Sequence, residues 1–247
     1  MAISTDSIIH YTNTFDKLEH ILKEGFGIKY CAEELKIEGE KGSLAAHPMI
    51  SFCDIPLSQS YRHFDAYGKY GLGLTKVWAN KMGINPVLYM ELNSSISKTL
   101  GRLLVERRNR SKSNLTKLQR NDILKIKCFT KNYSGHLKRE KIDNINYRFY
   151  DEREWRMVPE KDKLNGAKFS IGLKSYEKDK DKYNKLISDI RFRFSPNEIS
   201  YIIVNQTIEI PIVINILRTE YSAKCKPHEF DILLSKIVST EQIISDY

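Results

Sequence analysis

Four short apolar runs of the kind that forms β-strands are spread along this chain of 247 residues, and they constrain its fold most strongly. They are SIIHYTN at 7–13, MISFCDI at 49–55, PVLYMEL at 86–92 and EISYIIVN at 198–205. Each is rich in β-branched or aromatic residues. Segments with helical spacing lie between them, but there is no strict strand–helix–strand repeat of the kind that builds a parallel sheet. The sequence therefore predicts an α+β fold with a mostly antiparallel β core and peripheral helices.

No Pro-, Gly- or Ser-rich linker divides the chain, so we expect one domain over residues 1–247. Apolar spacing and Gly25 predict a helix that ends just before that glycine. The mixed, charged stretch 26–47 is interpreted as a loop. Further elements are predicted as helices over 74–83 and 210–222, a final strand over 231–239, and a terminal turn of helix that begins at Thr240.

The positive charge is concentrated in one segment. Residues 102–141 hold 13 Lys and Arg against 3 Asp and Glu, whereas the rest of the chain holds 27 against 28. We predict a basic, mostly helical insertion here, with one or two helices and a break near 111–114. Such a segment attracts phosphates, which makes a nucleic-acid partner plausible, although a solvated charged face gives the same pattern. The candidate contacts are Arg107, Arg108, Arg110, Lys112, Lys117 and Arg120.

Two carboxylates, Glu152 and Glu154, flank Arg153 in a run that alternates like a strand, YRFYDEREWRMVP at 147–159. Residues i and i+2 of a strand share a face, so we expect the two side chains to lie close together, with Arg156 beside them. Paired carboxylates suit reactions that pass through an oxocarbenium-like sugar cation. A solvated strand face with Glu–Arg pairs is the alternative interpretation.

Polar and aromatic groups on two other predicted strands complete the candidate site. His10, Tyr11 and Thr12 end the first apolar run, and histidine and threonine can hydrogen-bond a sugar or an amide. Ser51 and Phe52 lie in the second run. Aromatic rings such as Tyr67 and Tyr70 pack well against flat heterocycles. Ordinary packing in the core and loops is the alternative for each of these residues.

Other chemistries lack a motif in this sequence. There is no dinucleotide-binding glycine fingerprint, no phosphate-binding P-loop, no nucleophile elbow and no histidine spacing typical of a metal site, so we expect no metal. The four cysteines are far apart and show no CxxC pair, which indicates reduced thiols. No apolar run is long enough for a transmembrane helix, and the first residues lack a secretory pattern. We expect a cytoplasmic protein that is not bound to a membrane.

Several segments resemble the AbiGi-type abortive-infection family of bacteria. They are HYT near the start, ISFCDIPLS, YGKYGLGLTKVWA, NPVLYM and FYDEREWR. The resemblance implies a role in antiphage defence, as one half of a two-gene module in which this half is usually labelled the antitoxin. A partner protein from the same module is therefore expected.

The order of a His-x-Thr strand, a serine-centred strand and a Glu-headed strand is also similar to that of ADP-ribosyltransferases. That resemblance implies a split β core and NAD+ as the substrate. It assigns His10 and Thr12, with Tyr11 between them, to the first strand of an NAD+ site. Ser51 and Phe52 would line the nicotinamide pocket.

In the same comparison, Glu154 would hold the nicotinamide ribose and Glu152 would orient the acceptor. This chain has Tyr11 where many such enzymes carry glycine, and SFCD where one large class has Ser-Thr-Ser.

Three hypotheses follow. The first, which we favour, is an ADP-ribosyltransferase that moves ADP-ribose from NAD+ to a macromolecular acceptor such as a nucleic acid. The second is a non-catalytic antitoxin that binds a partner protein. The third is an RNA-processing enzyme that works without NAD+.

Overall fold

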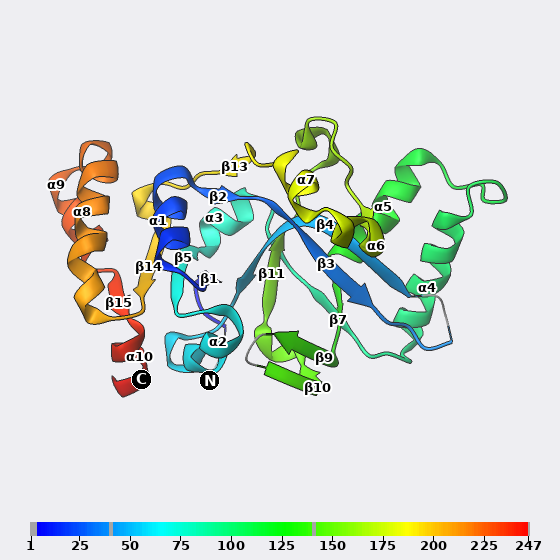
Figure 1. Cartoon of the computed structure of the whole chain (residues 1–247), viewed down its shortest axis with the longest axis horizontal. Helices are drawn as coiled ribbons and strands as arrows, with labels where there is room; N and C mark the ends of the chain where they lie inside the picture. Colours follow the sequence, from blue (N-terminus) through cyan, green and yellow to red (C-terminus); the bar gives the residue numbers. More distant parts are fainter. Residues whose placement is uncertain (1–3, 40–41, 140–141, 247) are drawn as a thin grey trace.

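The computed structural model describes residues 4–39, 42–139 and 142–246. Its centre is a β-sheet with the strand order β15–β14–β5–β1–β4–β11–β6 (Figure 1). Neighbouring strands are antiparallel except for the β14–β15 pair. Two further strands, β3 and β12, pair with β4 outside this path. The α+β class and the mostly antiparallel core are thus confirmed.

The strands of the main sheet are β1 (Ser7–Thr12), β3 (Lys29–Leu35), β4 (Ser43–Cys53), β5 (Tyr70–Thr75), β6 (Asn85–Pro86), β11 (Glu154–Met157), β12 (Ile171–Gly172), β14 (Ile199–Val204) and β15 (Ile237–Ser239). Three two-stranded ladders accompany it, formed by β2 (Phe26–Gly27) with β13 (Arg191–Phe192), β7 (Leu88–Met90) with β8 (Thr130–Asn132), and β9 (Ser134–Arg139) with β10 (Ile142–Arg148).

The helices are α1 (Phe15–Glu24), α2 (Leu57–Tyr67), α3 (Lys76–Lys81), α4 (Ser95–Arg108), α5 (Lys117–Cys128), α6 (Leu173–Lys178), α7 (Lys180–Lys185), α8 (Ile210–Tyr221), α9 (Pro227–Leu234) and α10 (Thr240–Asp246). None of the described helices is both long and apolar enough to cross a lipid bilayer.

Side chains alternate between the two faces of the sheet, and each face packs into its own hydrophobic core. Ile8 of β1 belongs to the larger core, which also contains Phe26, Phe52 and Trp78. Its neighbour Ile9 belongs to a smaller core on the other face of the sheet. The period of two therefore buries both faces of β1, and its apolar residues Ile8, Ile9 and Tyr11 are divided between the two faces.

The predicted helix ends are confirmed where neighbouring residues in the sequence determine them. α1 ends at Gly25, whose positive φ of 84° suits glycine and whose N–H donates to the Ile21 carbonyl at 2.9 Å. The helix over 210–222 and the terminal helix that begins at Thr240 are present as α8 and α10. The predicted helix over 74–83 is shorter, because its first residues complete β5.

Two predictions from local sequence are wrong. The stretch 26–47 is not a loop, because it forms β2, β3 and the start of β4. Three of the seven residues of β3 are charged and only Tyr30 and Leu35 are buried, so pairing with apolar β4 decides the structure. The predicted strand over 231–239 is mostly α9, which begins with Pro227 and is capped by Glu229, and only its end forms β15.

The basic segment 102–141 contains the two expected helical pieces, α4 and α5, with the break between them at 109–116. It is less helical than predicted, because residues 130–139 form β8 and β9. Its strand part also carries Lys131 and Arg139, which line the cleft described below. The strand part of the segment therefore forms one wall of the cleft. At its other end the helical part extends beyond the predicted bounds, because α4 begins at Ser95.

Candidate functional site

A cleft of about 1000 Å³ opens beside the ends of β1, β4 and β11. Its walls come from α1, β3, the segment from α7 to β13, and the region of β8 and β9. Eight of the nine residues predicted for an NAD+ site line it, namely His10, Tyr11, Thr12, Ser51, Phe52, Tyr67, Glu152 and Glu154. Adjacent strands thus place residues that are far apart in sequence in one cavity.

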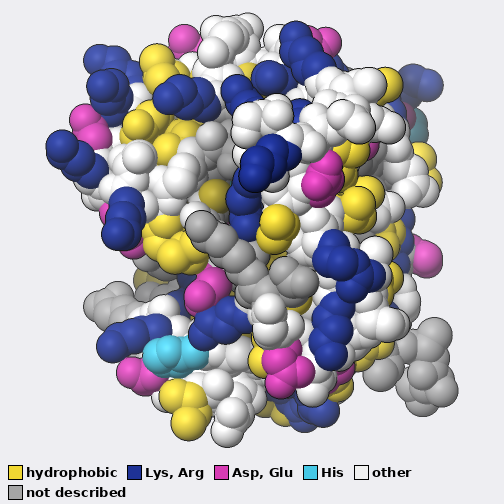
Figure 2. Space-filling model, turned by 90° about the vertical axis from the view of Figure 1, so that its right-hand side faces the viewer, with side chains coloured by type: hydrophobic (Ala, Val, Ile, Leu, Met, Phe, Trp, Pro, Cys, Tyr) yellow, Lys and Arg dark blue, Asp and Glu magenta, His cyan; other side chains and the backbone are white. Residues whose placement is uncertain are grey.

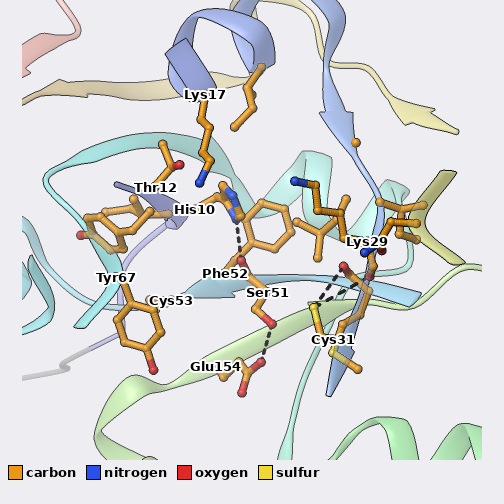
Figure 3. Close-up of a pocket in the computed structure, with 18 of the residues that line it drawn as sticks. His10, Thr12, Lys17, Lys29, Cys31, Ser51, Phe52, Cys53, Tyr67 and Glu154 are labelled. Atoms are coloured by element: carbon orange, nitrogen blue, oxygen red, sulfur yellow. Dashed lines mark hydrogen bonds between the residues drawn. The ribbon is translucent and has the colours of Figure 1, made fainter. Parts of the chain in front are cut away.

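Hydrogen bonds connect residues of β1, β4 and β11 along the floor of the cleft (Figure 3). His10 Nδ1 lies 2.8 Å from the Ser51 carbonyl oxygen, and Ser51 Oγ donates to Glu154 Oε1 at 2.6 Å. Because a carbonyl can only accept, Nδ1 carries the proton and Nε2 is left as an acceptor. Burial lowers the pKa of His10, although the bond to Ser51 opposes this, so the ring is neutral near pH 7.

Glu154 is a buried carboxylate that stays ionised. Arg156 donates to both of its oxygens, at 2.8 and 3.0 Å, and Lys131 Nζ lies 2.9 Å from Oε2. Burial alone would raise the pKa of this carboxyl, but the charges of Arg156 and Lys131 hold it well below its usual range. Arg156 therefore lies beside Glu154, as the sequence predicted.

Glu152 reaches the same place by a different backbone path from the one predicted. It lies in a 3-10 turn, and Arg153 after it has a left-handed conformation with φ of 45°, so the strand begins only at Glu154. The alternating pattern predicted one continuous strand, and the turn interrupts it. Lys131 nevertheless joins the two carboxylates, because its Nζ lies 2.7 Å from Glu152 Oε2, and the Tyr67 hydroxyl also donates to Glu152.

Sequence reasoning missed two residues of this cluster. Lys131 is on the short strand β8, where no motif indicated it, and only 13% of its side chain is exposed. Glu33 lies in the stretch interpreted as a loop, and its carboxylate is 2.8 Å from Arg156. A strand assignment for 29–35 would have placed Glu33 on a defined face, whereas no local signal indicates the position of Lys131.

A group of cations lines the opposite wall of the cleft: Lys17, Lys29, Lys185 and Arg191. Figure 3 shows Lys17 extending from α1 toward His10. The charged residues that line the whole cleft comprise six Lys or Arg and four Asp or Glu, a net charge of +2. Such a cleft favours a ligand whose anionic part meets these cations and whose other end approaches the carboxylates.

Tyr70 does not belong to this site. Its hydroxyl donates to Glu209 at 2.7 Å, and its ring packs edge-on against Phe15. The prediction failed because aromatic composition does not reveal which face of a strand a ring occupies. Two other predicted residues also have structural partners: Tyr11 donates to Ser60 at 2.7 Å, and Phe52 is 1% exposed in the larger core.

The six predicted nucleic-acid contacts lie outside the described lining of the cleft. Two of them hold the α4–α5 turn together rather than face solvent. Arg107 Nε donates to the Arg120 carbonyl at 2.8 Å, and Arg120 donates back to the Arg107 carbonyl and to the Leu115 carbonyl. Arg108 donates to the Gly42 carbonyl at 2.7 Å.

The other three, Arg110, Lys112 and Lys117, are exposed. Figure 2 shows the side of the molecule on which α4 and α5 lie in Figure 1, and there Lys and Arg side chains are spread out and interspersed with carboxylates. Among the residues that the structure describes, no group of three or more His, Cys, Asp or Glu could hold a metal ion.

Comparisons with known proteins place the chain in a family. Residues 25–205 match the family described as "Putative abortive phage resistance protein AbiGi, antitoxin". The abortive phage resistance protein AbiGi of Lactococcus lactis subsp. cremoris is 29% identical over 237 residues, which cover 87% of this chain and 95% of that protein. No solved structure matches, so the similarity to ADP-ribosyltransferases stays a prediction. The family match spans most of the chain and includes β4, β11 and the carboxylate cluster, and the chain belongs to the AbiGi family of phage-resistance proteins.

Proposed function

We propose that this protein acts in antiphage defence by binding NAD+ in the cleft and transferring ADP-ribose to a macromolecular acceptor. One observation carries the proposal: a buried, ionised Glu154, connected through Ser51 to a neutral His10, lies in a cleft whose other wall is cationic. NAD+ has a matching charge distribution, with a cationic nicotinamide ring and an anionic diphosphate. The cleft volume of about 1000 Å³ is also at the upper end of the range for small-molecule sites.

The contacts of Glu154 suggest that its role is electrostatic. Ser51, Arg156 and Lys131 already donate four hydrogen bonds to its two oxygens, which is the number that a carboxylate ordinarily accepts. Its fixed negative charge would stabilise the oxocarbenium-like sugar as the bond to nicotinamide breaks. The free Nε2 of His10 is an acceptor for a ribose hydroxyl.

In this proposal, Glu152 assists the second half of the transfer. As the acceptor's nucleophilic atom bonds to the sugar carbon, the electron pair of the broken bond stays on nicotinamide and the acceptor loses a proton. Glu152 shares Lys131 with Glu154 and lines the cleft, so it can take this proton.

Transfer of labelled NAD+ tests this proposal. The protein is incubated with NAD+ labelled on its adenine half and with bacterial lysate, and protease and nuclease treatments then identify the labelled product. We expect a labelled macromolecule with the native chain and none with Glu154→Gln. Glu160→Gln is the matched control, because this exposed carboxylate lies away from the cleft lining. Equal labelling by native protein and Glu154→Gln contradicts the proposed role of Glu154.

The description of the family favours a second candidate function, an antitoxin that restrains a partner protein. In that case the buried carboxylate cluster would be either the remnant of a catalytic site or a site that binds a ligand without catalysis. NAD+ would give no thermal stabilisation, whereas a ligand at 100 times its Kd adds about 2.7 kcal/mol. Absence of both label transfer and a thermal shift at millimolar NAD+ would select the antitoxin function.

A further inference from the structure

A second cavity, of about 610 Å³, adjoins the cleft and shares four lining residues with it: Ala32, Glu33, Lys131 and Arg139. One of its walls is strand β3, and the other is formed by β8, β9 and the residues just before α4. Because the shared residues stand between the two cavities, a molecule in this groove reaches the carboxylate cluster from the side opposite the cleft.

The outer edge of β3 faces this groove. β3 pairs with β4 through its other edge, and Tyr30 lies opposite Pro48, which has no N–H. Tyr30 accordingly directs its backbone groups away from β4: its N–H donates to Asn184 Oδ1 at 2.9 Å, and its carbonyl accepts from the Tyr176 hydroxyl at 2.7 Å. Backbone groups of an antiparallel strand alternate in direction with a period of two. Those of Ala32 and Glu34 therefore face outward as well.

Side chains cover this edge at both ends but not in the middle. Six residues after Tyr30, the N–H and carbonyl of Lys36 are both paired with the amide of Asn132, at 2.9 Å each. Ala32 and Glu34 are exposed, and no partner for their outward N–H and carbonyl groups occurs within the described residues. A short open stretch of strand edge, with four unpaired backbone groups, therefore lies between two capped ends.

We infer that this open edge binds an extended polypeptide segment of a partner protein as an added β-strand. Free N–H and carbonyl groups at the spacing of a strand are the complement of an extended peptide. The exposed carboxylate of Glu34 lies on this wall, and opposite charges on directly paired residues stabilise a strand pair. The segment therefore carries a basic side chain opposite Glu34, whereas Glu33 is already paired with Arg156.

This inference goes beyond the proposed NAD+ chemistry and does not require it. The residue of the segment that pairs with Glu33 shares its face of the strand. That face is directed toward Arg156, which contacts both Glu33 and Glu154. A bound segment thus places one of its side chains beside the carboxylate cluster.

The test uses the whole chain and a displayed library of random eight-residue peptides, with affinities measured on the enriched sequences. The key variant is Glu34→Pro, which removes one outward N–H without taking a hydrogen bond from β4, since proline is tolerated on strand edges. Glu34→Ala is the matched control because it removes the same carboxylate and keeps the N–H. We expect enrichment of peptides with a basic residue, and at least tenfold weaker binding by Glu34→Pro than by Glu34→Ala.

A second measurement keeps the inference testable if Glu34→Pro does not fold. The enriched peptide is made with one N-methylated backbone amide at each position in turn. Methylation at alternate positions, those whose N–H faces β3, is expected to weaken binding at least tenfold, and methylation at the others is not. Failure to enrich any peptide, or equal affinities for the methylated and plain peptides, overturns the inference.

The same variant separates this inference from the proposed function. Glu34 does not line the cleft, so a native NAD+ thermal shift in Glu34→Pro together with lost peptide binding supports the β3 site. Peptide binding that depends on the β3 edge, in a protein that shows no NAD+ shift, also supports it and contradicts only the NAD+ proposal.

Discussion

The carboxylate end of the cleft and the α4–α5 hairpin both concentrate charged residues, and they use their charges differently. In the cleft, Glu154 and Arg156 are almost completely buried and bind each other directly. On the hairpin, most charges are exposed, and two arginines are used to hold the turn. The sequence indicated both regions, the hairpin by its net positive charge and the cleft by the Glu152 and Glu154 pair, and the buried cluster has the more specific geometry. Burial, more than the number of charges, identifies a candidate site.

The largest effect is expected from removal of Arg156. Arg156→Met leaves Glu154 and Glu33 without their shared buried cation, and breaking a buried ion pair from one side costs about 3–5 kcal/mol. Unfolding in urea measures this loss. A cost below about 1 kcal/mol would show that water reaches the cluster and that the cleft is less enclosed than described.

Acid should destabilise the protein through its buried histidines. Burial lowers the pKa of His47 to about 3 and that of His63 to about 4. Because the unfolded chain protonates at the ordinary value of 6.5, their stabilisation is complete above pH 6.5 and is lost as the pH falls toward 4. We expect a loss on the order of 3 kcal/mol for each histidine between pH 7 and 4. In His47→Gln, this pH dependence should be clearly flatter, and an unchanged slope would contradict the assignment.

A smaller effect is expected at the α4–α5 turn. Arg120→Ala removes hydrogen bonds to the carbonyls of Leu115 and Arg107, so we expect a cost of about 1–2 kcal/mol. Amide hydrogen exchange should increase in 109–120 before other segments. Exchange that rises equally throughout the molecule would contradict a stabilising role of Arg120 confined to this turn.

The smallest effects are expected at the exposed cations of the hairpin. Arg110→Ala and Lys112→Ala should each change stability by less than about 0.5 kcal/mol. They should also leave any NAD+ thermal shift unchanged, because neither residue lines the cleft. A lost NAD+ shift in either variant would remove the distinction between the two regions.

Strands and helix ends that depend on local patterns could be predicted from the sequence. β1 and β14 carry apolar residues on both faces, and both faces are largely buried, while α1 ends at a glycine with positive φ. The convergence of His10, Ser51 and Glu154 could also be predicted, since each lies on a strand of the same sheet.

Long-range pairing could not be predicted. β3 is a strand because β4 pairs with it, although three of its seven residues are charged. Lys131 follows the α4–α5 hairpin, which packs against the end of β3, and no local pattern encodes its contact with Glu154. Glu152 was predicted to share the site, but a single left-handed residue, Arg153, changes the backbone path that brings it there.

Hydrogen–deuterium exchange with and without NAD+ tests the central claim most directly. We predict that NAD+ protects β1, the start of α1, β3 and residues 184–191, which line the cleft, and leaves α4 and α5 unchanged. Protection confined to α4 and α5, or no protection at saturating NAD+, would contradict the assignment of the cleft as the functional site.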